Sequence, residues 1–125
     1  MNTTKIFQWN CGGFHNKRAE FLNTMSNMDV VCLQETWLGE KDTVASAGFI
    51  IFRNDRVGDR MGGTAIFCRV SLDPTPFKAP WLQDLGFEAT AIVINRFKQK
   101  SKKLVIFSLY RPPNISVGRA KWRVL

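Results

Sequence analysis

The amino-acid sequence predicts a single α/β domain with about six strands and one main helix. Six short apolar runs are separated by polar or glycine-containing segments, which is the pattern of strands in a sheet. The chain opens with a strand, an amphipathic helix and a second strand, the unit that makes two parallel neighbours. Its 125 residues allow one domain with a moderate core, and its 45% hydrophobic content excludes a disordered chain.

The opening unit is predicted from Ile6 to Trp37. Ile6 to Asn10 is a short strand, and Gly12-Gly13 supplies a tight turn in which positive φ is allowed. His15 to Met28 is predicted as a helix, and Val30 to Trp37 as the next strand. The apolar residues of the helix segment recur at three- and four-residue steps, at Phe14, Phe21, Leu22, Met25 and Met28.

The remaining strands follow without a further clear helix. They are predicted at Phe49 to Phe52, Thr64 to Val70, Glu88 to Phe97 and Lys103 to Tyr110. Asp73 to Pro80 holds three of the five prolines and cannot be a central strand. Lys98 to Lys102 suits the turn of a β-hairpin. One helix cannot cover both faces of one sheet, so the strands split into a sandwich, or a missing segment or second chain covers the other face.

Composition and charge narrow the class of protein. The net charge of +8 favours a polyanionic partner such as nucleic acid, although it also serves solubility. The three cysteines are widely spaced and there is one histidine, which argues against a zinc site or a disulfide framework. We expect an intracellular protein outside the membrane, because there is no signal-peptide core and no run of about 18 apolar residues.

Three polar side chains stand where apolar strands end. Glu35 stops the apolar run of the second strand, Asn10 closes the first, and Tyr110 closes the last. If these strands are neighbours of the same polarity, the three side chains converge on one rim, where ligand sites of α/β sheets lie. Glu35 with the amide oxygen of Asn10 would form part of a Mg²⁺ site, and Tyr110 would donate to a phosphate oxygen. The alternatives are a solvated acid, a turn residue and a ring at a sheet edge, respectively.

Four motifs in this order resemble the endonuclease/exonuclease/phosphatase superfamily. Within it, they most resemble the apurinic-endonuclease-like domain of non-LTR retrotransposons, and the Gln-Glu-Thr-Trp and Tyr-Arg-Pro-Pro segments favour that branch. The motifs are Phe7-Gln8-Trp9-Asn10-Cys11, Cys32-Leu33-Gln34-Glu35-Thr36-Trp37, Gly62-Gly63-Thr64-Ala65-Ile66 and Ser108-Leu109-Tyr110-Arg111-Pro112-Pro113-Asn114.

The resemblance implies a four-layered α/β sandwich and Mg²⁺- or Mn²⁺-dependent cleavage of a DNA phosphodiester, in the nucleus. By motif position, Glu35 would bind the metal, Asn10 would position the metal or the attacking water, and Tyr110 would contact the scissile phosphate. The basic loops could follow the DNA backbone, although each basic residue can equally belong to a solvated turn. The candidate DNA contacts are Arg53, Arg56, Arg60, Lys98, Lys100 and Arg111.

Two motifs of this superfamily are missing from the sequence. Neither a Gly-Asp-Phe-Asn segment after Tyr110 nor a closing Ser-Asp-His is present, and the only histidine, His15, begins the helix. We therefore expect a single incomplete domain over residues 1–125, with a core at 5–114 and a tail at 115–125. It would be the amino-terminal half, supplying one sheet without its opposing sheet, so that the uncovered face drives self-association or pairing with another chain.

The missing motifs also bear on activity. Groups that activate water or stabilise phosphoryl charge are commonly worth factors of about 10² to 10⁴ in rate, so we expect little or no activity from this chain alone. Two other functions stay open. One is a catalytically silent nucleic-acid-binding or interaction remnant, and the other is a phosphatase-branch enzyme that acts on a small phosphate ester.

Overall fold

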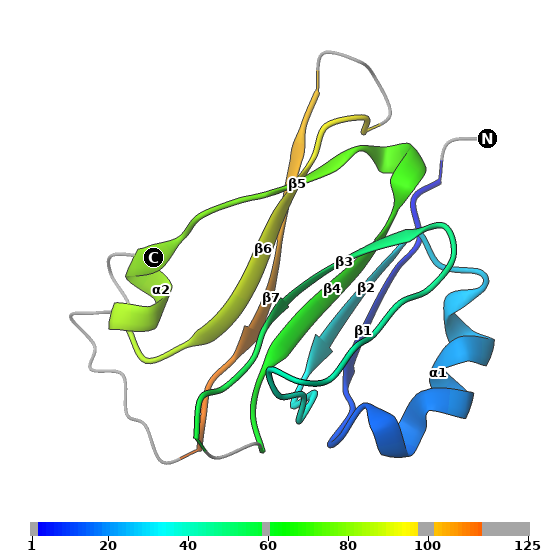
Figure 1. Cartoon of the computed structure of the whole chain (residues 1–125). Helices are drawn as coiled ribbons and strands as arrows, with labels where there is room; N and C mark the ends of the chain where they lie inside the picture. The colour runs from blue at the N-terminus through cyan, green and yellow to red at the C-terminus, as the bar shows by residue number, and fades with distance from the viewer. Residues whose placement is uncertain (1–2, 59–60, 98–101, 114–125) are drawn as a thin grey trace.

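The structure is a computed structural model that describes residues 3–58, 61–97 and 102–113 (Figure 1). These residues form seven strands in two sheets, with two α-helices and two short 3-10 helices. The strands are β1 (Ile6–Asn10), β2 (Val30–Gln34), β3 (Phe49–Asn54), β4 (Thr64–Arg69), β5 (Pro74–Pro76), β6 (Glu88–Ile94) and β7 (Leu104–Tyr110). The helices are α1 (Arg18–Met25) and α2 (Pro80–Asp84), and the 3-10 helices are His15–Lys17 and Val70–Leu72. The predicted α/β class and all six predicted strands are confirmed.

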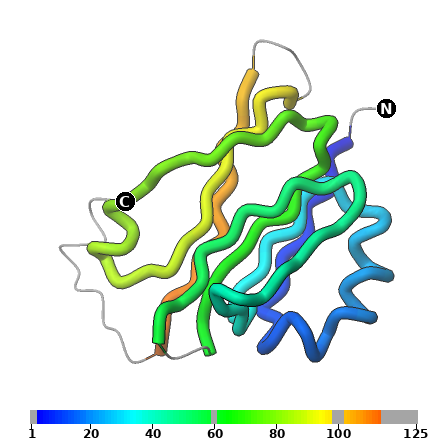
Figure 2. Tube along the Cα trace, viewed as in Figure 1, coloured from blue at the N-terminus to red at the C-terminus, as the bar shows by residue number. Residues whose placement is uncertain are grey.

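The first sheet has the strand order β1-β2-β4-β3. β1 and β2 are parallel, as the opening strand–helix–strand pattern predicts, and β4 is antiparallel to both β2 and β3. The helix is shorter than predicted, since a 3-10 turn precedes α1 and α1 ends at Met25. Figure 2 shows α1 on the side of this sheet away from β6 and β7. Phe14 and Phe21 pack there against Phe67 of β4, with ring centroids 4.9 to 5.8 Å apart.

The second sheet has the order β5-β6-β7, and both of its strand pairs are antiparallel. The predicted hairpin pairing of β6 with β7 is confirmed, although the turn at 98–101 lies outside the described residues. β5 and α2 are not among the predicted elements. β5 carries two prolines and lies at the edge of its sheet, where a residue without an N–H is tolerated.

The expectation of one sheet without its opposing sheet is wrong, because this chain supplies both. The sheets pack face to face through inward-facing residues of β2, β4, β6 and β7. Alternate positions of β6 and β7 are buried, so each strand buries one face, which favours a sandwich over a single wider sheet. The buried residues of this layer are Val30, Cys32, Ile66, Cys68, Ile92, Ile94 and Ile106.

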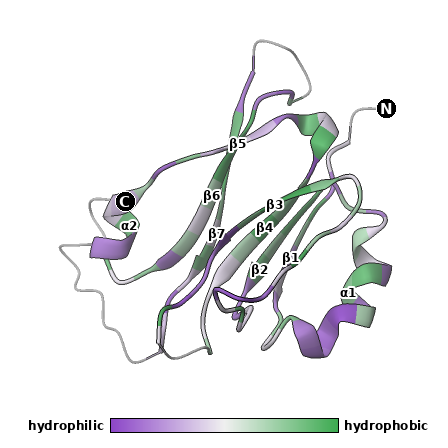
Figure 3. Ribbon diagram, viewed as in Figure 1, coloured by the Kyte–Doolittle hydropathy of each residue, from purple (hydrophilic) through white to green (hydrophobic). Residues whose placement is uncertain are grey.

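The outer surfaces of the two sheets differ. The first sheet is covered by α1, and Figure 3 shows hydrophobic residues along its central strands β2 and β4. On β7, by contrast, Val105, Phe107 and Leu109 are each about 40% exposed. The face that we expected to be uncovered is therefore paired, and the exposed apolar side chains lie on the opposite face of β7. No helix within the described segments is long and apolar enough to cross a membrane.

Candidate functional site

Asn10 and Glu35 meet at the carboxyl ends of two parallel neighbours. Asn10 is the last residue of β1 and pairs in register with Gln34 of β2, so Glu35 follows directly beyond the same edge. The amide Nδ2 of Asn10 donates a hydrogen bond of 2.8 Å to Glu35 Oε2. Asn10 is exposed and Glu35 is half-buried, so solvent reaches this pair. The predicted proximity of the amide and the acid is present in the structure.

Tyr110 reaches the same point from the opposing sheet. It ends β7, and its phenol lies beside the Glu35 carboxylate. Burial raises the pKa of Tyr110 above its ordinary value, and the charge of Glu35 and hydrogen bonding to it raise it further, while Arg56 lowers it. The three predicted side chains therefore converge, but they do so across a sandwich and not along the rim of one sheet.

The backbone around Glu35 is tightly held. Glu35 and Trp37 both have positive φ, 53° and 56°, a conformation that non-glycine residues seldom adopt and that is common at functional sites. Gly13 N donates to Glu35 O at 2.8 Å, and Trp37 N donates to Gly62 O at 2.9 Å. A Cβ on Gly13, whose φ is 103°, would lie 2.7 Å from Trp37 Cε3. The segments Gly12-Gly13 and Gly62-Gly63 thus hold the loop that contains Glu35 in place.

Arg56 stands beside Tyr110 and is paired with an acid. Its Nε lies 2.6 Å from Glu88 Oε2, and its guanidinium carbon lies 6.0 Å from the centre of the Tyr110 ring. The other oxygen of Glu88 accepts a hydrogen bond of 2.8 Å from Gly63 N. Glu88, which we did not single out in the sequence, therefore holds both Gly63 and Arg56 at the rim of the site and fixes Arg56 near the phenol.

The other candidate DNA contacts have different surroundings. Arg53 is engaged within the protein, because its guanidinium binds the Asp55 carboxylate and the carbonyl oxygens of Gly39 and Asp42. Arg111 is exposed immediately after Tyr110. The remaining three, Arg60, Lys98 and Lys100, lie outside the described residues. The nucleic-acid role of all six stays a prediction.

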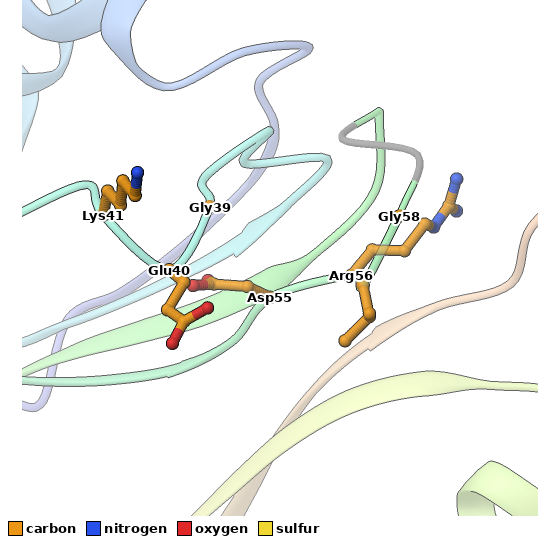
Figure 4. A pocket seen from close by; sticks show the side chains of 7 residues that line it. Gly39, Glu40, Lys41, Asp55, Arg56 and Gly58 are labelled. Carbon is orange, nitrogen blue, oxygen red and sulfur yellow. The ribbon is translucent and has the colours of Figure 1, made fainter.

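A cavity of about 460 Å³ lies next to Arg56, between residues 39–41 and 55–58 (Figure 4). Its wall carries Glu40, Lys41, Asp55 and Arg56. Two of these charges are already neutralised, since Asp55 pairs with Arg53 and Arg56 pairs with Glu88. The cavity therefore does not present an unopposed basic surface to a phosphate.

Below the rim lies a buried polar layer that we did not predict. Gln34 Nε2 donates to Ser108 Oγ at 2.9 Å, and the hydroxyls of Thr64 and Thr90 are 2.8 Å apart. All four side chains are at least nine-tenths buried. Counting inward positions by two along each predicted strand would have found this layer, because Ile106 leads to Ser108 and Ile92 leads to Thr90.

The donor set at the rim suits a hard cation only in part. Glu35 provides a carboxylate, and Asn10 uses its N–H for that carboxylate, so its amide oxygen is the atom that can face a cation. Mg²⁺ commonly takes one or two carboxylates and otherwise water and phosphate oxygens, so these two residues fit. Within the described part of the chain, no group of three or more His, Cys, Asp or Glu could form a more complete metal site.

Cys11 lies beneath the same loop and does not add a ligand. Its thiol is buried and approaches the carbonyl oxygen of Glu35 at 3.5 Å. Burial raises the pKa of Cys11 above its ordinary value of 9.0, so the thiol stays protonated at neutral pH. All three cysteines, Cys11, Cys32 and Cys68, are free and buried.

Comparisons with known proteins agree with this architecture. The model of the Endonuclease/Exonuclease/phosphatase family matches residues 7–124. The 3' phosphatase NExo from Neisseria, solved with a product DNA hairpin, is similar with a TM-score of 0.59 and 20% identity, covering 82% of this chain and 40% of its own. The APE2 catalytic domain of Xenopus laevis is similar with a TM-score of 0.57 and 22% identity, covering 86% of this chain and 45% of its own.

Because both sequence identities are low, these similarities show the fold alone. The chain spans less than half the length of either solved structure. A search of curated proteins found no match.

Proposed function

Because the chain belongs to the endonuclease/exonuclease/phosphatase family, we propose that it is a nuclease domain that hydrolyses a DNA phosphodiester with Mg²⁺ or Mn²⁺. The observation that carries this proposal is the meeting of Asn10, Glu35 and Tyr110 at one solvent-accessible point, from strands of two sheets. An acid, an amide and a phenol in contact provide a cation ligand, its support and a hydrogen-bond donor for a phosphate oxygen.

Each of the three residues has a distinct task in this proposal. Glu35 holds the cation, and Asn10 orients the carboxylate through its 2.8 Å hydrogen bond. Tyr110 keeps its proton at neutral pH, because burial and the Glu35 charge raise its pKa, and the phenol can turn this single proton from Glu35 to a phosphate oxygen when substrate binds. When bound, the metal would supply Lewis-acid polarisation of the phosphoryl oxygen and a more acidic water.

DNA is the proposed substrate class, and the retrotransposon-type branch is the proposed subfamily. The net charge of +8 favours a polyanion, and Arg111 is exposed directly beside Tyr110. The Tyr-Arg-Pro-Pro segment from 110 to 113 supports the retrotransposon branch. The two motifs that are absent from the sequence lead us to propose weak or no cleavage by this chain alone.

Glu35→Gln tests the proposal, with Glu40→Gln as the matched control. Both variants remove one carboxylate, but Glu40 is exposed and outside the three-residue site. We expect Glu35→Gln to weaken Mn²⁺ binding in calorimetry and to abolish any metal-dependent nicking of supercoiled plasmid, while Glu40→Gln leaves both unchanged. Equal Mn²⁺ affinity in Glu35→Gln and the unmodified chain would contradict the proposed metal site.

A nucleic-acid-binding protein without cleavage is the second candidate, favoured by the net charge together with the two absent motifs. We expect a duplex oligonucleotide to bind with an affinity that falls steeply as salt increases, measured by fluorescence anisotropy. Binding of this kind in a chain that neither binds Mn²⁺ nor nicks plasmid would select this function over the nuclease.

We also propose that the chain associates with a second copy of itself through the exposed face of β7. Val105, Phe107 and Leu109 alternate along this strand and are about 40% exposed. Phe107→Lys should increase the monomer fraction in size-exclusion chromatography with light scattering. A monomeric unmodified chain would contradict this proposal without affecting the proposed chemistry.

A further inference from the structure

The layer between the two sheets becomes polar as it approaches the rim. Along β2 the inward side chains are Val30, Cys32 and then Gln34, and along β7 they include Ile106 and then Ser108. The first residues are apolar, whereas Gln34 and Ser108 are polar and are nevertheless only 5% and 1% exposed. Buried polar groups cost free energy unless they are hydrogen-bonded, so this pair has to be matched across the sheets.

Gln34 and Ser108 belong to one continuous chain of hydrogen bonds. Gln8 Nε2 donates to Gln34 Oε1, and Gln34 Nε2 donates to Ser108 Oγ at 2.9 Å. The Ser108 hydroxyl in turn donates to the carbonyl oxygen of Leu33 at 2.8 Å. Ser108 is thus bound both to a side chain and to the backbone of β2, the strand that Glu35 directly follows.

We propose that Gln34 and Ser108 are positioning residues that set the register of β7 against β2 and thereby place Tyr110 against Glu35. The catalytic meaning of this placement rests on the proposed function, whereas the placement itself does not.

The positions of Gln34 and Ser108 along their strands let the hydrogen bond between them determine where Glu35 and Tyr110 lie. Gln34 directly precedes Glu35, and Ser108 is two residues before Tyr110 on the same face of β7. A slide of one residue of β7 along β2 would move Tyr110 by about 3.3 Å and break its contact with Glu35. Hydrophobic contact in the apolar part of the layer is non-directional, so it specifies this register less sharply than the hydrogen bonds do.

Thr64 and Thr90 provide an internal control. Their hydroxyls form a second buried hydrogen bond in the same polar layer, 2.8 Å long, between β4 and β6. Neither strand carries Glu35 or Tyr110. Thr90→Val therefore removes a buried hydrogen bond of the same kind without touching the link from β2 to β7.

Tyr110 is the only tyrosine in the sequence, which allows a direct experiment. In the full chain labelled with ring-¹³C tyrosine, every tyrosine NMR signal belongs to Tyr110, and the nuclear Overhauser effect to the Glu35 side chain reports their contact. We expect Ser108→Ala to lose this signal, and Thr90→Val and the hydroxyl-retaining Ser108→Thr to keep it. A Ser108→Ala protein that keeps the signal at full intensity overturns the proposal.

Gln34→Met is the second variant, in case Ser108→Ala does not fold. It preserves side-chain length and removes the donor to Ser108, and the same two outcomes decide the proposal. Where plasmid is cleaved, loss of the register should lower kcat by about 10- to 100-fold with little change in KM, because misplacement of about 1 Å has effects of this size. If the unmodified chain neither binds Mn²⁺ nor cleaves plasmid, the nuclease proposal fails, whereas the NMR comparison still decides the positioning role.

Discussion

The two ends of the layer between the sheets use the same strands for different purposes. At one end, Ile92 and Ile94 of β6 are fully buried against apolar residues of β2 and β4. At the other end, the same strand contributes Thr90 to a hydrogen bond and Glu88 to an ion pair with Arg56. The inward positions change from apolar to polar to charged within seven residues of one strand.

The two ends of the layer therefore make different contributions: the apolar end stabilises the contact between the sheets, and the polar end determines how the sheets are placed. Burial of apolar area holds the two sheets together, and its free energy follows the area buried more than the direction of individual contacts. Hydrogen bonds depend on distance and angle, so the polar end selects one relative placement of the sheets. The residues of the candidate site stand at that end, where Glu35 of one sheet has to meet Tyr110 of the other.

The largest expected effect comes from breaking the apolar end with Ile92→Ala. Ile92 is 0% exposed, so its truncation leaves a cavity and should lower the free energy of unfolding by about 2–5 kcal/mol in urea denaturation. Val105→Ala is the control, because this residue of β7 is 39% exposed on the outer face and should cost less than about 1 kcal/mol. Similar losses from both variants would contradict the assignment of inner and outer faces.

Much of the fold could be predicted because its strands are short apolar runs. The parallel pairing of β1 with β2 followed from the helix between them, and the β6–β7 hairpin from the polar turn between two apolar runs. The division into two sheets could not be decided, because sequence pattern fixes which face of a strand is buried but not which sheet buries it. β5, with two prolines in three residues, has no strand pattern of its own and forms through pairing with β6.

The candidate site was predictable at the level of residue types. Asn10, Glu35 and Tyr110 stand at strand ends, and a strand end is a local feature of the sequence. The side chains that surround them depend on contacts between distant segments, and 74 residues separate Gln34 from Ser108. Arg56 shows the same limit, since its pairing with Glu88 requires the two sheets to be placed first.

The second prediction tests the polar end through Thr64 and Thr90. Thr90→Val alone leaves the Thr64 hydroxyl buried without its partner, and should cost about 1–3 kcal/mol in the free energy of unfolding. Thr64→Val with Thr90→Val removes both hydroxyls without changing their shape, and should be close to neutral. A double variant that loses the sum of the two single losses would show that this pair does not act as a matched unit.

The smallest expected effect concerns the pKa of Tyr110, because the residue is only partly buried. Burial, the Glu35 charge and the hydrogen bond to Glu35 raise this pKa above 10.0, so Glu35→Gln should lower it toward that value, while Glu40→Gln should not. Tyrosinate absorbance reports the titration directly, since Tyr110 is the only tyrosine. An unchanged titration in Glu35→Gln would contradict the contact between the two side chains.

The same shift has a defined sign for stability. Tyr110 is harder to ionise in the folded chain than in the unfolded chain, so its contribution is fully present below the unfolded pKa of about 10. It is lost as the pH rises through the folded pKa. The alkaline decline in the urea midpoint should therefore be shallower in Glu35→Gln, in which the charge that opposes ionisation of the phenol is absent, and a decline of equal slope would mean that Tyr110 and Glu35 are not coupled.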